Sequence, residues 1–365
     1  MGSCHFCKVD PKQQLKSCAC KKVSYCSKDC QAKDWKNHKP SCPPYIIREV
    51  PGKGRGLFAT RKIKEGQVIL DEYPLITLPD GIKLVDFMVR HYPKLDQDTK
   101  DKILRLHDPA ENFKDLDSKT VEKLISKDQK RQLWMEAESD EMIKIFRIIC
   151  HNAFHICWDS SLCSNIETGL YSQFSLINHS CNPNSLTTWV NGDFKRHQVR
   201  ALKTIEKEEE INLRYCYSYN EEFQYRTRDL RRKKLFDDMA FMCQVSECSL
   251  EGEALEDNER LRAEINEKFA EMENLLCCGG GSPENRAMML TLERLELVKK
   301  LDYRMSIVLE LLQVYKLASE SKMLGMSAPD PNIFKVEALD YARKYGDVKL
   351  NEYNIFLKKY SRFLE

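Results

Sequence analysis

The stretch Asn178-His179-Ser180-Cys181-Asn182-Pro183-Asn184 decides the fold, and it lies inside a longer segment, residues 169–215. The string is too polar for a core strand and too specific for an ordinary turn, so it indicates a functional loop. An apolar run at 174–177 precedes it, and a charged turn at 206–210 leads into alternating apolar positions at 211–215. We therefore predict two short strands on either side of a polar loop.

The bulk composition is that of a soluble, folded chain. It has 365 residues, of which 42% are hydrophobic and 31% are charged, and this length allows about two or three domains. The net charge of +2 gives no overall attraction to nucleic acid or to a membrane. No stretch reaches the roughly 18 apolar residues that a membrane span needs, and the N-terminus does not resemble a secretion signal. We expect a cytoplasmic and nuclear protein that is a monomer.

The cysteines gather at the N-terminus. Seven of the sixteen fall within the first 42 residues, a segment too short to bury a core of its own. In a reducing compartment such cysteines are thiols or metal ligands rather than disulfides, so a metal must supply the folding energy. Eight candidate ligands make two tetrahedral zinc sites, and they are Cys4, Cys7, Cys18, Cys20, Cys26, Cys30, His38 and Cys42.

Three details of this N-terminal module bear on its role. Ser27 can cap a helix over residues 28–39, which carries zinc ligands. His5 could replace Cys20 as a ligand if Cys20 points away, although a lone histidine beside a ligand is more often a bystander. The first 42 residues hold nine lysines and three acidic residues but no arginine that could read bases or clamp phosphates. We therefore expect the module to contact protein rather than nucleic acid.

Short strands should follow the module, because Gly and Pro turns separate the apolar runs 45–50, 56–60 and 67–78. Between the first two runs, Lys53-Gly54-Arg55-Gly56 predicts a tight hairpin. It is not a dinucleotide or phosphate loop, because no third glycine and no Gly-Lys-Ser/Thr follows.

The remaining segments are predicted to be helical. Residues 80–147 are charged and Pro-punctuated, with Val121, Leu124 and Ile125 at helical spacing, and an apolar helix from Met142 ends near Asn152. We expect the basic helix after Arg226 to present a solvated face, and the less favoured alternative is a nuclear localisation signal. The C-terminal third should be all helical, with helices near 254–276, 286–300, 303–319, 334–344 and 352–363.

Three strings carry a resemblance to a known family: Gly169-Leu170-Tyr171, the Asn178 to Asn184 string, and Glu209-Glu210-Ile211 followed by Tyr215. Together they resemble the SET domain of protein lysine methyltransferases. With the cysteine-rich module in front, the chain is similar to the SET-and-MYND (SMYD) group, closest in layout to the arthropod SmydA branch. The resemblance covers most of residues 1–250.

The resemblance implies an α+β fold, in which a SET-domain β-fold carries a helical insert, an N-terminal MYND zinc finger and an all-helical C-terminal domain. In the SET fold the Asn178 segment threads under the strand that bears Tyr215. The implied domains are the finger at 1–43, SET segments at 44–79 and 148–240 around an insert at 80–147, a degenerate post-SET segment at 241–252 and the helical domain at 253–365.

The resemblance also implies the function, which is S-adenosylmethionine-dependent N-methylation of a lysine in a histone or non-histone protein. Tyr215 matches the catalytic tyrosine, and Asn152 matches a cofactor contact, with a helix-end cap as the other reading. The matched cofactor-binding residues are Gly54, Arg55, Gly56, Asn152, Asn178, His179 and Tyr215. The MYND pairing would join Cys4, Cys7, Cys26 and Cys30 at one zinc, and Cys18, Cys20, His38 and Cys42 at the other.

Two departures from the family pattern fall on the substrate side. The post-SET zinc motif would need a middle cysteine where Val245 stands, so we predict that a third zinc, at Cys181, Cys243 and Cys248, is absent or weak. Met239 stands where active relatives carry a second tyrosine. These losses favour an alternative function, a SET-fold adaptor that binds protein partners through its MYND finger and its helical tail.

Overall fold

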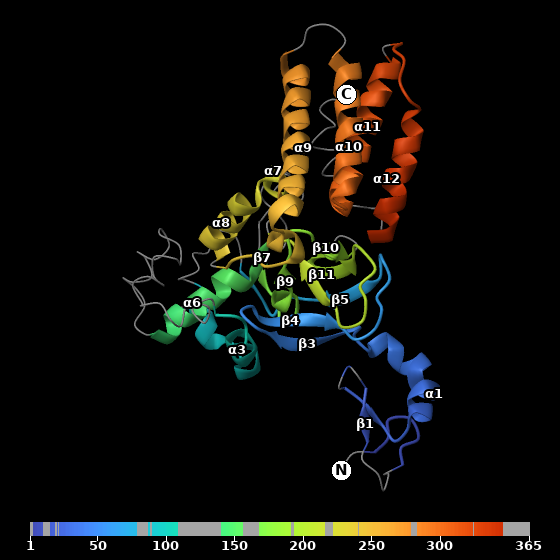
Figure 1. The fold of residues 1–365 in the computed structure, drawn as a ribbon. Coiled ribbons are helices and arrows are strands. Elements are labelled where there is room, and N and C mark those ends of the chain that lie inside the picture. Colours follow the sequence, from blue (N-terminus) through green and yellow to red (C-terminus); the bar gives the residue numbers. More distant parts are fainter. Residues whose placement is uncertain are drawn as a thin grey trace.

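The computed structural model describes most of the chain: residues 3–9, 15–18, 20, 22–78, 87, 90–108, 140–155, 168–190, 193–215, 222–239, 241–278, 283–323 and 325–345. Three parts follow one another (Figure 1): a small N-terminal module, a central group of short sheets, and a set of long helices beyond the sheets. Each part has a buried core of its own. The predicted helices at 121–125 and 352–363 lie outside the described residues.

The N-terminal module has little regular structure. It consists of β1 (Lys16–Ser17), β2 (Ser24–Tyr25), α1 (Lys28–His38) and the 3₁₀ turn η1 (Lys39–Ser41). The Ser27 side chain accepts a hydrogen bond from the backbone N–H of Cys30, so the predicted cap of α1 is confirmed. Its buried cluster consists of cysteines and one tyrosine rather than a set of large aliphatic residues, as expected of a metal-dependent fold.

The central part contains three short sheets. One sheet has the order β3-β4-β12-β9, formed by β3 (Tyr45–Val50), β4 (Gly54–Ala59), β12 (Glu210–Leu213) and β9 (Asn178–His179). A second has the order β10-β11-β5, formed by β10 (Ser185–Val190), β11 (Asp193–Ala201) and β5 (Val68–Glu72). The third has the order β6-β8-β7, formed by β6 (Ile76–Leu78), β8 (Thr168–Leu170) and β7 (Ala153–His155).

The prediction of a strand before the polar loop is wrong. Residues Phe174–Leu176 form a 3₁₀ turn, η4, and the strand β9 begins only at Asn178. All three residues of η4 are buried, so their apolar run fills the core as a turn instead of alternating across a sheet. The run at 67–78 is also two strands, β5 and β6, because Pro74 lies between them.

Helices flank the sheets. The described insert residues form η2 (Tyr92–Lys94) and α3 (Gln97–Leu104), and the apolar helix is α6 (Asp140–Asn152). Ile145, Ile148 and Ile149 of α6 are almost completely buried in the same core as the sheets. The segment after β12 forms α7 (Glu222–Tyr225), α8 (Arg228–Met239) and the 3₁₀ turn η5 (Ser246–Ser249).

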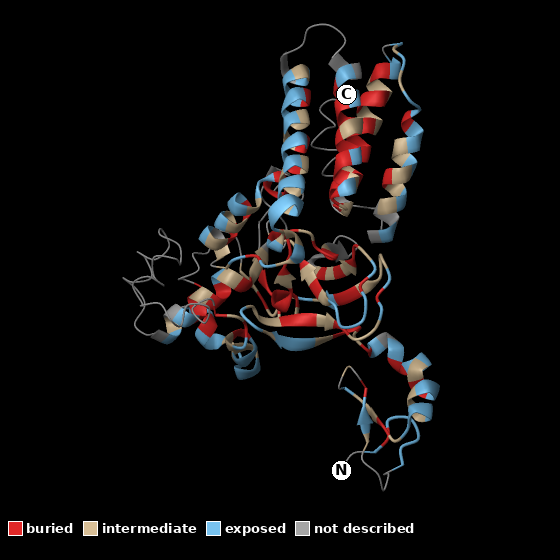
Figure 2. Ribbon diagram, viewed as in Figure 1, coloured by how far each residue is buried: buried red, intermediate tan, exposed pale blue. Residues whose placement is uncertain are grey.

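The C-terminal part is a row of antiparallel helices, α9 (Gly252–Cys278), α10 (Pro283–Lys300), α11 (Arg304–Met323) and α12 (Pro331–Tyr345). Consecutive helices pack side by side, with buried residues on their facing sides (Figure 2). α9 ends at Cys278, two residues beyond the predicted end at 276. No described helix is long and apolar enough to cross a membrane.

Candidate cofactor site and zinc clusters

The central strand of the four-stranded sheet brings together segments that lie far apart in the sequence. β12 is antiparallel to β4, with Glu210 opposite Phe58, and parallel to β9, with Asn212 opposite Asn178. The glycine hairpin therefore lies on one side of β12 and the polar string on the other. Tyr215 follows two residues after the end of β12, not within the strand as predicted.

Asn178 is held between the hairpin and β12. Its amide Nδ2 donates to the carbonyl of Arg55 at 3.1 Å and to Glu210 Oε1 at 2.7 Å. Gly56 lies beside this pair: a Cβ at position 56 would be 2.8 Å from Glu210 Oε1 and 2.9 Å from Asn178 Nδ2. Only a glycine at position 56 leaves the two side chains in place.

The other hairpin glycine lies against the helical insert. Gly54 has a positive φ of 71°, and a Cβ there would be 3.2 Å from His107 Nδ1. The buried Asn152 donates its Nδ2 hydrogens to the carbonyls of His107, at 2.8 Å, and Ile148, at 2.7 Å. Asn152 thus closes the end of α6, as in the capping alternative, and also holds His107, whose ring lies beside Gly54, against that helix end.

His179 links the polar string to the segment after β12. Its Nδ1 accepts the backbone N–H of Tyr215 at 3.0 Å, and its Nε2 lies 3.5 Å from Cys181 Sγ. Because a backbone N–H can only donate, the proton of the neutral ring belongs on Nε2. Burial lowers the pKa of His179 to about 3, so the ring is neutral at physiological pH.

Tyr215 stands in an aromatic surround. Its hydroxyl donates to the carbonyl of Ile177 at 2.7 Å, and its ring makes edge contacts with Phe154, His179 and Phe241. Burial, with a smaller contribution from the charge of Glu210, holds the pKa of Tyr215 well above its usual value. The phenol is therefore protonated and fixed in direction.

Glu72 stabilises the turn that leads into this site, a role that no pattern in the sequence indicated. Its carboxylate accepts the backbone N–H groups of Ser172 at 3.0 Å, Gln173 at 3.2 Å and Phe174 at 2.9 Å, and the Ser172 hydroxyl at 2.5 Å. A carboxylate at the start of a helical turn satisfies backbone donors that have no partner within the turn. Glu72 therefore holds the turn η4 in place, and with it the start of the polar string that follows.

The N-terminal ligands form two groups of four. Cys4, Cys7, Cys26 and Cys30 make one group and Cys18, Cys20, His38 and Cys42 the other, and within each group the ligand atoms lie within 4.8 Å of one another. These are the predicted pairings. Seven thiols and one imidazole suit Zn²⁺ in tetrahedral coordination. The Ser41 hydroxyl lies 3.4 Å from His38 Nδ1, which leaves Nε2 to face the metal position.

His5 is not part of either group. Its Nδ1 lies 2.8 Å from Asp34 Oδ2, and the same oxygen accepts the Tyr25 hydroxyl at 2.8 Å. His5 therefore supports the module from outside the clusters, as expected of a bystander.

The guanidinium of Arg61, from the turn after β4, donates to the carbonyl of Cys42 at 3.0 Å and stacks over Trp35. This contact joins the zinc module to the central sheets.

The ligand atoms of His179, Cys181 and Cys243 lie within 4.8 Å of one another, so this buried group has the spacing of a metal site but not the four thiols of a usual post-SET zinc. Within the described part of the chain the cluster offers three thiols, Cys181, Cys243 and Cys248, and the ring of His179. His179 Nε2 carries the proton required by the Nδ1 contact, so it lacks the lone pair that a ligand needs. The guanidinium of Arg231 lies 3.7 Å from Cys248 Sγ instead.

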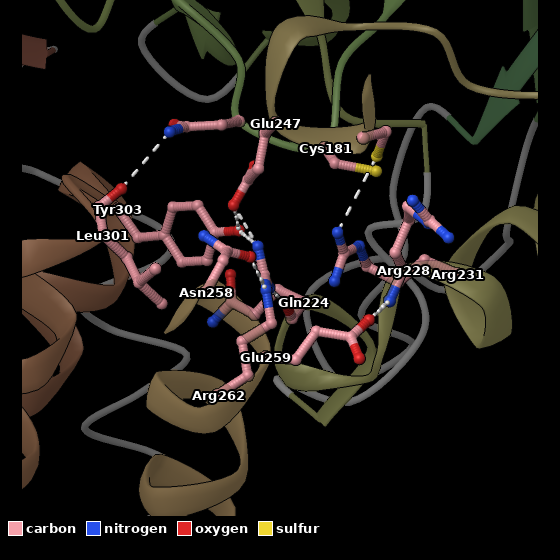
Figure 3. Close-up of polar contacts among 12 residues, drawn as sticks. Cys181, Gln224, Arg228, Arg231, Glu247, Asn258, Glu259, Arg262, Leu301 and Tyr303 are labelled. Atoms are coloured by element: carbon pink, nitrogen blue, oxygen red, sulfur yellow. Dashed lines mark hydrogen bonds and ion pairs between the residues drawn. The ribbon is translucent and has the colours of Figure 1, made fainter. Parts of the chain in front are cut away.

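Arg231 corrects the interpretation of the basic helix as a wholly solvated face, because its exposed fraction is 1%. Hydrogen bonds from Cys181 and Cys243, together with the charge of Arg231, hold the pKa of Cys248 well below its usual value. A guanidinium beside a thiolate thus supplies positive charge within this cluster (Figure 3).

The helical domain is fixed to the same region by buried polar contacts (Figure 3). Arg262 of α9 is 1% exposed and contacts Glu247 of η5, the Tyr303 hydroxyl and the carbonyl of Gln224. In the polar string, Asn182 Nδ2 donates to the carbonyl of Leu301 at 3.2 Å. The turn between α10 and α11 therefore touches the string that contains Asn178.

Comparison with known proteins agrees with these features. The SET domain family matches residues 54–216. The chain carries a SET domain. The MYND finger family matches residues 4–42, so the two zinc-ligand groups are those of a MYND finger. Both domains in one chain, together with the relatives below, support the SMYD family.

The relatives are lysine methyltransferases by name. N-lysine methyltransferase SMYD2 of Sus scrofa is 27% identical over 264 residues, 72% of this chain and 53% of the relative. Histone-lysine N-methyltransferase SMYD3 of Mus musculus is 25% identical over 284 residues, 74% and 58% of the two chains. The chain spans about half the length of these curated relatives. The solved SET domain of LSMT bound to lysine and AdoHcy has 13% identity over 90% of this chain and 91% of that chain, with a TM-score of 0.38, too low to add support.

Proposed function

We propose that the chain is an S-adenosylmethionine-dependent protein lysine N-methyltransferase that acts on a histone or non-histone protein. The proposal rests on one observation: the sheet order β4-β12-β9 gathers Gly56, Asn178 and His179 next to Tyr215. Gly54, Arg55, Gly56, Asn178 and His179 would hold the cofactor, with Asn152 behind them. The SMYD relatives support the reaction class.

The cofactor, when bound, supplies a methyl group already activated by a sulfonium. The chain has to supply alignment, which is worth up to roughly 7 to 11 kcal/mol in well-oriented reactions. Tyr215 serves this purpose, because its hydroxyl proton is donated to the carbonyl of Ile177 and its oxygen can therefore only accept further hydrogen bonds. Weak C–H hydrogen bonds to that oxygen, about 0.5 to 1 kcal/mol each, fix direction more than they lower the barrier.

The lysine must arrive as a neutral amine. With a pKa of about 10.4, roughly one lysine in a thousand is neutral near pH 7.4. Tyr215 is not the base, because its raised pKa disfavours the phenolate. The apolar surround of Phe154 and Phe241 lowers the pKa of a buried amine by desolvation, and its proton leaves to solvent.

Several finer features belong to the same proposal. Two zinc ions bind the MYND finger, the post-SET cluster binds zinc weakly or not at all, and the layout is that of the arthropod SmydA branch. The finger binds protein partners rather than nucleic acid, and the protein is a monomer in the cytoplasm and nucleus. The two complete ligand groups support the zinc count, and the finger-first order supports the branch.

Calorimetry with S-adenosylmethionine tests the cofactor site. Asn178→Ala should weaken binding at least about tenfold, because it removes the amide between Arg55 and Glu210. Asn182→Ala is the matched control: it removes the same side chain from the same string, but one that faces Leu301. Equal binding by the Asn178 variant and the wild type would remove the cofactor-site assignment.

A SET-fold adaptor is the second candidate. Val245, in place of a zinc-binding cysteine, and Met239, in place of a tyrosine, favour it. Tyr215→Phe separates the two functions. If the chain is an enzyme, the variant loses methyl transfer; if it is an adaptor, the wild type transfers no methyl group and the variant keeps all partner binding.

A further inference from the structure

Glu210 begins a strand that contacts both halves of the candidate cofactor site. This strand, β12, lies between β4 with its glycine hairpin and β9 with Asn178. The Glu210 side chain is 19% exposed, and its two carboxylate oxygens have different partners. Oε1 accepts Asn178 Nδ2 at 2.7 Å, and Oε2 lies 3.5 Å from Lys53 Nζ.

The contacts of Asn178 determine what its amide can offer to a ligand. Nδ2 has two hydrogens, and its two partners, the carbonyl of Arg55 and the carboxylate of Glu210, are groups that can only accept. The opposite orientation of the amide would place Oδ1 against two acceptors. Both donors are therefore used inside the protein, and the amide has only Oδ1 left for a ligand.

Gly56 and Lys53 keep Glu210 in this position. A Cβ at position 56 would overlap Glu210 Oε1 and Asn178 Nδ2, at 2.8 and 2.9 Å, so the glycine makes room for the contact between them. Lys53 is the first residue of the hairpin, and its Nζ lies 3.5 Å from the other carboxylate oxygen. Glu210 is thereby anchored from one side while it orients Asn178 on the other.

We infer that Glu210 is a positioning residue that fixes the Asn178 amide with its oxygen toward the ligand, so that the site selects a ligand with a cationic N–H donor. The inference rests on the proposed function and names the part of the cofactor that it concerns, the α-ammonium of the amino-acid moiety. The carboxylate also adds a negative charge beside that position, which favours an ammonium, although the Lys53 ammonium 3.5 Å from its other oxygen offsets part of this charge. The adenosine moiety gains nothing from either effect.

Two ligands that share the thioadenosine part and differ in the amino-acid moiety provide the test. S-adenosylhomocysteine carries the ammonium, whereas methylthioadenosine lacks the whole amino-acid part. By calorimetry, Glu210→Ala should weaken binding of S-adenosylhomocysteine about tenfold or more, since a hydrogen bond to a charged group is lost, and leave methylthioadenosine within about twofold. Glu210→Gln retains an acceptor for Asn178 but no charge, so its effect should be intermediate.

Glu208→Gln is the matched control. It removes the same charge from the same turn, but Glu208 is exposed and pairs with Arg48. It should bind both ligands as the wild type does. Methylthioadenosine binding also reports that each variant is folded.

Three outcomes decide the matter. A loss confined to S-adenosylhomocysteine supports the inference. An equal loss for both ligands, or no loss for either, overturns it while leaving the proposed function intact. A wild-type chain that binds neither ligand overturns the proposed function, and the inference with it.

Discussion

Gly56 shows how one absent side chain shapes the candidate site. Part of its role is to leave space for the contact between Glu210 and Asn178, and not only to let backbone approach a ligand. A nearby glycine, Gly52, has a φ of 72°, but a Cβ added there would meet nothing within 4 Å. A substitution at Gly56 therefore tests crowding between side chains, whereas one at Gly52 tests backbone strain.

Gly56→Ala should weaken S-adenosylhomocysteine binding at least about tenfold, because the new methyl displaces Asn178 or Glu210. Gly52→Ala should cost about 1 to 2 kcal/mol of unfolding free energy and leave that affinity unchanged. Calorimetry and urea denaturation measure both quantities. Equal affinities for the Gly56 variant and the wild type would contradict the packing at the hairpin.

His179 predicts a pH dependence of stability. Its pKa falls from about 6.5 in an unfolded chain to about 3 in the fold, so the unfolded state binds the extra proton between these values. The contribution is therefore complete above about pH 6.5 and is lost as the pH falls, at roughly 1.4 kcal/mol per pH unit.

His179→Asn, which cannot take up a proton, should show a shallower loss of unfolding free energy between about pH 6.5 and 4.5 than the wild type. Acid release of zinc from the finger affects both proteins equally, so the difference between the curves isolates His179. Parallel curves would show that the ring is not buried in its neutral form.

α8 turns one arginine of a basic run into the core. Arg231 and the fully buried Leu235 are four residues apart and share one face of the helix, whereas the Lys233 side chain is 73% exposed. The inward arginine meets Cys248 and the carbonyl of Arg226, and it brings positive charge to the three-thiol cluster.

Arg231→Met should lower the unfolding free energy by about 3 to 5 kcal/mol, the usual cost of breaking a buried charge pair. Lys233→Met, on the same helix, should change it by less than about 0.5 kcal/mol. Urea denaturation followed by circular dichroism measures both. Similar small effects would mean that the cluster does not depend on the guanidinium.

Short-range patterns were enough to predict several elements. Eight soft ligands in 42 residues leave few other uses, so their number predicted two zinc sites, whereas their division into two groups came from the resemblance to the MYND finger. The helix bounds followed from caps and apolar periodicity, as at Ser27. Arg231 was missed although a signal existed, because its four-residue spacing from Leu235 marks the inner face of α8.

Other features had no local signal. Glu72 and Ser172 are a hundred positions apart, and only the fold brings that carboxylate to the turn before Asn178. Glu210 stood in a recognised string, but its contact with Asn178 depends on the register between β12 and β9. The turn η4 was predicted as a strand because a short buried apolar run is compatible with either structure.

The whole molecule joins its separate cores through a few specific contacts. Arg61 ties the finger to the sheets, and Arg262 ties the helical domain to η5. The proposed domain boundaries at 43, 79, 147, 240 and 252 remain predictions. The zinc content of the chain tests whether the metal binds only in the finger.

Native mass spectrometry should find two zinc ions per chain, both held by the finger. Cys30→Ser should reduce the count to one, while Cys243→Ser should leave it at two because the post-SET cluster relies on Arg231. Three ions in the wild type, with one lost in the Cys243 variant, would show that the post-SET cluster binds metal.

Methyl transfer itself is the most direct measurement of the proposed activity. The wild-type chain, S-adenosylmethionine and a broad library of lysine peptides should yield peptides heavier by one or more methyl groups in the mass spectrum, and Tyr215→Phe should yield none. If a wild-type chain that binds the cofactor transferred no methyl group to any lysine peptide or protein extract, the enzyme assignment would be contradicted and the adaptor would take its place.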